Sequence, residues 1–246
     1  MNGFEYVRSM HSFYRPRTPR AALLAAEMDM LPVEALVYKG SSVKPLFEEP
    51  YDPDELERVL ARPDLSFTDA MVLAEILVAM THETDKERAL FAAESFTSLE
   101  NRWARLVEDR RTALAKDGGD EEAIFGLARA LYEQALIVGR SAPIRNYYLG
   151  EAYYLLVSRP SGPGGGKLFN LRMRCLLRLG LLEQAEAEIR EEQERNGISG
   201  ELLALAVESA YLGKDLRKIR NLLEGLDLGS LGLDRELAAL FEFWQG

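Results

Sequence analysis

Apolar residues recur at helical spacing along most of this 246-residue chain, and this periodicity constrains the fold more than any other feature. Alternation of apolar and polar residues, which marks a half-buried strand, is nearly absent. The stretch "FTDAMVLAEILVAM" is preceded by Ser66 and carries Asp69 three positions later, a pattern typical of a helix N-terminus. We therefore predict an all-α fold.

Start and stop signals divide the chain into helical segments. A short helix is predicted to begin at Pro53, and a long one to begin at a cap formed by Thr84 with Glu87 and to end at Gly118 and Gly119. Asp120, and Ser141 with Pro143, predict two further starts. The later helices are expected at residues 168–179, 181–195, 200–212 and 215–224, followed by "DRELAALFEFW".

One pattern occurs twice among these later segments. In "LLRLGLLEQAEAEI", Ala185 lies five residues after Gly180, and in "AYLGKDLRKIRNLL", Gly213 lies 33 residues after Gly180. This pattern resembles the tetratricopeptide repeat (TPR), in which a small residue permits a tight turn between two antiparallel helices and an alanine lets the second helix approach the first. A third copy is suggested by Leu127, Ala128, Leu131 and Ala152.

The resemblance implies antiparallel helical hairpins stacked as a TPR-like α-solenoid, in which each hairpin needs its neighbours to complete a core. The array is degenerate, because Lys218 replaces the usual alanine, Glu192 occupies a second small position, and Gly197 stands where a closing proline is common. We expect four parts: a basic flexible arm or juxtamembrane segment at 1–20, an N-terminal helical region at 21–119, the repeats at 120–225, and a C-terminal capping helix at 226–246.

A polar stripe precedes the first glycine of the pair. Lys167, Asn170, Arg174 and Arg178 are spaced by three, four and four residues, so they share one face of a helix, opposite an apolar stripe. The resemblance implies that the first helix of each hairpin lines a concave groove, where such side chains hold acidic groups or the chain terminus of a bound peptide. Arginine suits carboxylate capture. The alternative is a solvated basic face, and it stays open.

The glycine run in "SRPSGPGGGKLFN" does not match a phosphate-binding loop. That motif needs G-x-x-x-x-G-K-[ST] after a strand, whereas Ser161 occupies the first glycine position and Leu168 follows the lysine. We predict a linker and no nucleotide binding. The tyrosines nearby, at 147, 148, 153 and 154, are predicted to be core residues.

Composition excludes several classes of function. The net charge of −10 and the pI near 4.9 argue against nucleic-acid binding. His11, His82 and the lone Cys175 leave a zinc site almost without ligands, and they form no recognisable catalytic set. We expect no metal, no cofactor and no enzyme activity.

The N-terminal stretch from Tyr6 to Arg20 carries four arginines, no acid and three aromatic residues. Such a flank is expected on the cytoplasmic side of a membrane helix. With the repeats, this layout resembles the TPR domains joined to membrane helices in Pel-type exopolysaccharide export machines. It implies a cytoplasmic protein tethered to the inner membrane by a segment preceding residue 1.

We therefore predict a non-catalytic scaffold or adaptor whose partner is a protein, either an acidic peptide segment or another subunit of a membrane complex. Self-association is left open. A helical enzyme or a regulator of small-molecule signalling remains the alternative function.

Overall fold

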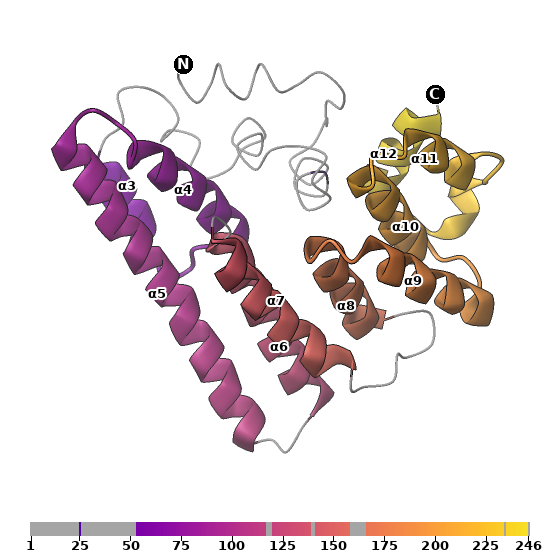
Figure 1. The fold of residues 1–246 in the computed structure, drawn as a ribbon, viewed down its shortest axis with the longest axis horizontal. Coiled ribbons are helices and arrows are strands. Elements are labelled where there is room, and N and C mark those ends of the chain that lie inside the picture. Colours follow the sequence, from indigo (N-terminus) through magenta and orange to yellow (C-terminus); the bar gives the residue numbers. More distant parts are fainter. Residues whose placement is uncertain are drawn as a thin grey trace. The chain divides into compact units, whose positions relative to one another are not determined.

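The computed structural model describes residue 25 and residues 53–116, 120–138, 141–157, 166–233 and 235–245. These residues are helical, apart from their connecting turns, and contain no strand (Figure 1). The all-α prediction is confirmed for the described part. The predicted arm at 1–20, the glycines Gly118 and Gly119 predicted to end the long helix, and the glycine run up to residue 165 lie outside the described residues.

The described α-helices are α3 (Pro53–Leu60), α4 (Phe67–Met80), α5 (Lys86–Lys116), α6 (Glu121–Ile137), α7 (Ala142–Val157), α8 (Gly166–Arg178), α9 (Leu182–Asn196), α10 (Gly200–Leu212), α11 (Leu216–Leu223) and α12 (Arg235–Gln245).

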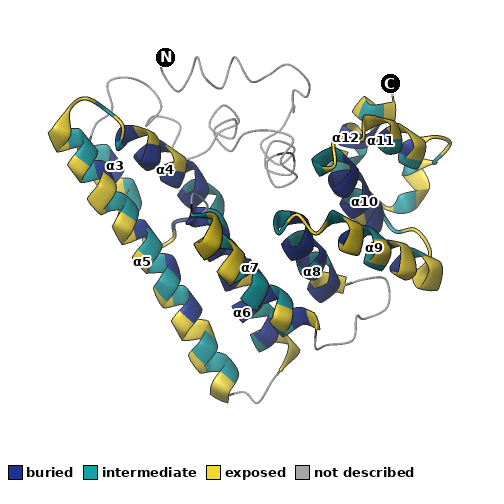
Figure 2. Cartoon of the chain, in the orientation of Figure 1, coloured by how far each residue is buried: buried dark blue, intermediate teal, exposed yellow. Residues whose placement is uncertain are grey.

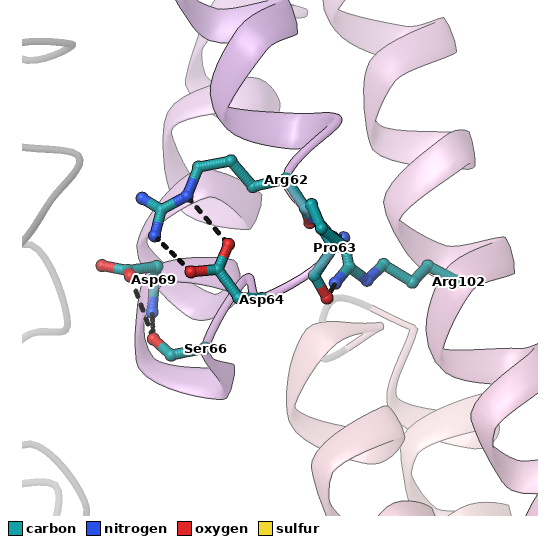
Figure 3. A network of polar contacts seen from close by, with 6 residues as sticks. All are labelled: Arg62, Pro63, Asp64, Ser66, Asp69 and Arg102. Carbon is teal, nitrogen blue, oxygen red and sulfur yellow. Dashed lines mark hydrogen bonds and ion pairs between the residues drawn. The ribbon is translucent and has the colours of Figure 1, made fainter.

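The chain divides into two compact units, 1–102 and 103–246, with the boundary inside α5. In the first unit, Arg102 of α5 holds the turn between α3 and α4 (Figure 3). Its guanidinium donates hydrogen bonds to the backbone oxygens of Arg62 at 2.6 Å and Pro63 at 2.7 Å. Within the turn, Arg62 pairs with Asp64. Polar contacts thus fix the turn, since backbone carbonyls without a helical partner need another donor.

Two helix starts in the first unit show how local chemistry sets the boundaries. Ser66 caps α4 as predicted, because its hydroxyl oxygen accepts a hydrogen bond from the backbone N–H of Asp69 at 3.1 Å. The predicted cap at Thr84 is wrong. Asp85 takes this role, because its carboxylate accepts from the N–H groups of Glu87 at 3.0 Å and Arg88 at 3.3 Å. A carboxylate directly before the first turn also stabilises the positive end of the helix.

The second unit is built from hairpins of successive helices. α6 packs against α7, α8 against α9 and α10 against α11, and α8 also contacts α6, α7 and α10. Two apolar clusters form the core. The first joins α5, α6, α7 and α8 through residues that include Val107, Leu131 and Leu149, and the second joins α8, α9 and α10. The expected stack of antiparallel hairpins is therefore present.

α8 lies between these two clusters and is buried along most of its length (Figure 2). Leu171 and Cys175 belong to the first cluster, whereas Phe169 and Met173 belong to the second. A single apolar stripe was predicted for this helix. The structure instead buries apolar side chains on two sides, because α8 has neighbours on both, and leaves only a narrow polar face.

The two glycines of the repeated pattern end their helices differently. Gly180 has φ +76°, and the N–H of Leu181 bonds back to the oxygen of Leu176, the arrangement of a glycine C-cap. Gly213 is right-handed at φ −72°, and Lys214 takes the left-handed position at φ 59°. The left-handed residue is thus the glycine itself in the first turn and the residue after the glycine in the second.

The departures from the TPR pattern have local explanations. Lys218, at the alanine position, lies on α11 and pairs with Glu186 of α9 at 2.6 Å. Glu192 is almost fully buried and accepts a hydrogen bond from the side chain of Asn196 at 2.6 Å. Gly197 ends α9 with φ +80°, which proline cannot adopt. Charged groups are tolerated at these positions because each has a polar partner nearby.

The C-terminal helix α12 folds back onto α11 and the short 3-10 helix η3 (Leu228–Leu231). Leu240 and Phe241 are buried there, and the side chain of Gln245 donates to the backbone oxygen of Leu223 at 2.9 Å. The apolar residues of this segment therefore serve mainly to pack against the preceding helices. Among the described helices, none has the length and apolar character needed to cross a membrane.

Candidate functional site

The four residues predicted as a binding stripe all lie on α8, and we call them the α8 polar face: Lys167, Asn170, Arg174 and Arg178. The flanking helices are α6 and α10, each the first helix of a neighbouring hairpin. Lys167 is exposed, and the other three are partly buried. The face is therefore a strip bounded on both sides by side chains of α6 and α10.

At the N-terminal end of α8, the strip is paired with carboxylates of the protein itself. The ammonium group of Lys167 donates to the carboxylate of Glu122 on α6, and it lies 4.9 Å from the centre of the Phe125 ring. The hydrogen bond to Glu122 raises the pKa of Lys167 above its ordinary value. The side-chain amide of Asn170 donates to Glu201 on α10. Each flanking helix thus contributes one carboxylate to this end.

The side-chain amide of Asn170 makes one hydrogen bond within the protein. Its nitrogen donates to Glu201, whereas its buried oxygen accepts no hydrogen bond within the protein. A side-chain amide can both donate and accept. Because this oxygen is enclosed by the protein, it cannot accept a hydrogen bond from a bound chain.

At the C-terminal end of α8, the strip reaches into the interior. Arg178 hydrogen-bonds to the phenol of Tyr132 on α6, and Arg174 and Glu208 lie near enough to influence that phenol electrostatically. Tyr132 and Glu208 are both buried. Burial, the largest effect, raises the pKa of Tyr132. Arg178 therefore ties α8 to α6, a structural role that the sequence did not indicate.

The sequence interpretation missed the acidic residues that flank the strip. Glu122, Glu201 and Glu208 come from α6 and α10, the first helices of the adjacent hairpins. The resemblance implied that all first helices share one groove. Applying that rule to α6 and α10 as well as to α8 would have brought these carboxylates next to the predicted cations.

Another arginine of α8, Arg172, makes its contacts on the side of the helix that faces α9. Arg172 pairs with Glu188 of α9 at 2.9 Å, with side chains only 13% and 22% exposed, and stacks 5.2 Å from the Phe169 ring. This ion pair fastens α8 to α9 within its own hairpin. Arg172 is thus separate from the α8 polar face.

The tyrosines of α7 differ in part from the prediction. Tyr148 and Tyr153 pack partly buried against the first apolar cluster, as expected of core residues. Tyr147 and Tyr154 are 63% and 77% exposed, so their assignment to the core is wrong. They are on the outer side of α7 because α6 and α8 already cover its inner side.

The described residues on either side of the glycine run are helical, whereas a phosphate-binding loop follows a strand. The described residues before it, 142–157, form helix α7, and α8 begins at Gly166. Lys167 is engaged by Glu122. Within the described ranges, no group of three His, Cys, Asp or Glu side chains is placed to hold a metal ion.

Comparisons of this chain with protein-family models, with curated proteins and with solved structures found no match. The geometry of the hairpins and of the α8 polar face is therefore the basis for a function.

Proposed function

We propose that residues 120–225 form a degenerate TPR array that acts as a non-catalytic scaffold and binds an acidic segment of a protein partner on the α8 polar face. The observation that carries the proposal is the position of this face. α8 packs against both α6 and α10, so the first helices of three successive hairpins are neighbours.

The chemistry of the face supports an acidic segment. Two cations of the face, Lys167 and Arg174, lie along α8 on either side of Asn170, whereas Arg178 is held at Tyr132. Ammonium and guanidinium groups suit carboxylates, and several acting together give specificity as well as attraction. An extended peptide can contact successive side chains of such a column.

The cellular setting is a further part of the proposal. We place the array on the cytoplasmic side of a membrane-anchored assembly, of the kind that exports exopolysaccharide in Pel-type systems. The layout of a basic aromatic stretch before helical repeats supports this setting. Cell fractionation tests it, since the full-length protein should sediment with inner membranes and be retained there after a high-salt wash.

Paired pull-downs test the binding proposal. The double variant Lys167→Ala with Arg174→Ala removes two cations of the face, and Arg178 is left intact because it supports Tyr132. Arg195→Ala is the matched control, since Arg195 is exposed on α9 and pairs only with acids of its own helix. Partners captured by the wild type and by Arg195→Ala should be lost with the double variant. An identical set of partners from all three proteins would refute the proposal.

Far-UV circular dichroism and tryptophan fluorescence accompany the pull-downs. Trp103 and Trp244 both lie in the second unit, so an unchanged emission spectrum shows that packing around these two side chains is retained, and an unchanged circular dichroism spectrum shows that the helices are. Loss of binding can then be attributed to the face itself.

A further inference from the structure

We infer that Glu122 and Glu201 occupy the α8 polar face in the free protein and are displaced by the carboxylates of an acidic peptide. This inference rests on the proposed function. Only a partner segment with enough acidic residues to displace both would then bind.

Both carboxylates lie against the α8 polar face. Glu122 receives the hydrogen bond of Lys167, and Glu201 receives that of Asn170. These are the donors that an acidic segment would use. They come from α6 and α10, on opposite sides of α8, so a peptide lying along α8 has to take the place of both.

The exposure of these contacts makes displacement feasible. The side chains of Lys167 and Glu122 are 43% and 71% exposed, so water already competes for both groups. Ion pairs at such exposed sites are weak. The released carboxylates can turn to solvent at little cost, because Glu122 and Glu201 are both exposed residues.

The C-terminal end of α8 offers no carboxylate that a peptide could displace in the same way. There, Glu208 and Tyr132 are buried, and neither can move into water without breaking the packing of its helix. Exchange of partners is therefore confined to the N-terminal half of α8, where Lys167 and Asn170 lie.

Glu122 and Glu201 affect binding because they neutralise part of the positive charge of the α8 polar face. The three cations of α8 lie beside Glu122, Glu201 and Glu208, so the face carries little net charge in the free protein. A weakly acidic chain gains little by replacing the internal carboxylates. A segment with several adjacent acidic residues gains more, because it replaces both internal carboxylates, Glu122 and Glu201, at once.

The test uses a fluorescein-labelled hexaglutamate peptide titrated with the full-length protein at low ionic strength, where exposed charges are least screened. Fluorescence anisotropy gives the dissociation constant. Glu122→Gln should tighten binding by up to about fivefold, the range expected for one exposed ion pair. Glu201→Gln should tighten it less, because Glu201 is hydrogen-bonded to the neutral amide of Asn170. Binding by the double variant should be tighter than by either single variant.

Glu191→Gln is the matched control. It also removes one exposed negative charge, but Glu191 lies on α9 and pairs with Arg195. Unchanged binding by this variant, together with the gain in the other two, supports the inference. Equal tightening by all three variants would show a general charge effect and overturn it, as would weaker binding by Glu122→Gln or Glu201→Gln.

The Lys167→Ala, Arg174→Ala double variant separates this inference from the proposed function. If that variant loses the peptide and the two glutamine variants bind like the wild type, the face binds acidic segments but is not gated by its own acids. If no protein in the series binds the peptide, both ideas fail. Binding that appears only in the glutamine variants supports both.

Discussion

The two glycines of the repeated pattern should respond differently to alanine, although the sequence makes them equivalent. Gly180 has φ +76°, a conformation that costs an L-residue about 1–2 kcal/mol. A Cβ built there meets no atom within 4 Å, so the penalty is one of backbone conformation alone. Alanine also reduces the freedom of the unfolded chain, which offsets about 0.4–1 kcal/mol. Gly180→Ala should therefore destabilise the fold by about 1 kcal/mol.

Gly213 provides the matched comparison. Its φ of −72° suits alanine, and the closest neighbour of an added Cβ is the backbone oxygen of Ser209 at 3.3 Å. The gain from the unfolded state and this tight contact should nearly cancel, so Gly213→Ala is expected to change the free energy of unfolding by less than about 0.5 kcal/mol. Lys214→Gly should be neutral or stabilising, because Lys214 holds the left-handed position in that turn.

Urea titration followed by tryptophan fluorescence measures all three variants, since Trp103 and Trp244 both lie in the second unit. The expected order of stability is Gly180→Ala lowest, the wild type and Gly213→Ala close together, and Lys214→Gly equal or highest. Equal losses for the two alanine variants, or a loss for Lys214→Gly, would refute the assignment of the left-handed residue in each turn.

Three further predictions concern residues outside the turns. Arg102→Met should destabilise the α3–α4 turn by about 1–2 kcal/mol, because its bonds to the carbonyls of Arg62 and Pro63 are lost, and hydrogen exchange should accelerate at residues 61–66. Burial raises the pKa of the Cys175 thiol to about 12, so Ellman's reagent at pH 8 should react with it only after unfolding. The pKa of Tyr132 is raised by burial, so the unfolded chain loses this proton first. Stability should fall as the pH rises above about 10, by at most about 1.4 kcal/mol per pH unit, and Tyr132→Phe should reduce that slope in an alkaline titration.

The sequence predicted the helices well, because their periodicity and caps are local. α4 and α10 have the predicted bounds, and Ser66 and Asp120 cap their helices through side-chain oxygens as expected. The cap at Asp85 was missed because Thr84 beside it also fits the pattern. Local signals of similar strength cannot be ranked without the geometry of the turn.

What the sequence could not supply was the set of contacts between helices. Glu122 and Glu201 are ordinary surface acids until α6 and α10 are placed beside α8. Similarly, nothing in "LFNLRMRCLLR" distinguishes Arg172, which fastens α8 to α9, from Arg178, which reaches Tyr132. The candidate residues were thus found on the right helix, but their partners depend on packing between hairpins.

The central place of α8 bears on how the hairpin array comes apart. In many helical repeats each hairpin contacts only its nearest neighbours, and the ends can fray while the middle persists. Here one 13-residue helix supplies side chains to both apolar clusters, including Cys175 to one and Met173 to the other. Melting of α8 would remove part of each cluster together, so the hairpins on either side should lose their structure in a single cooperative transition.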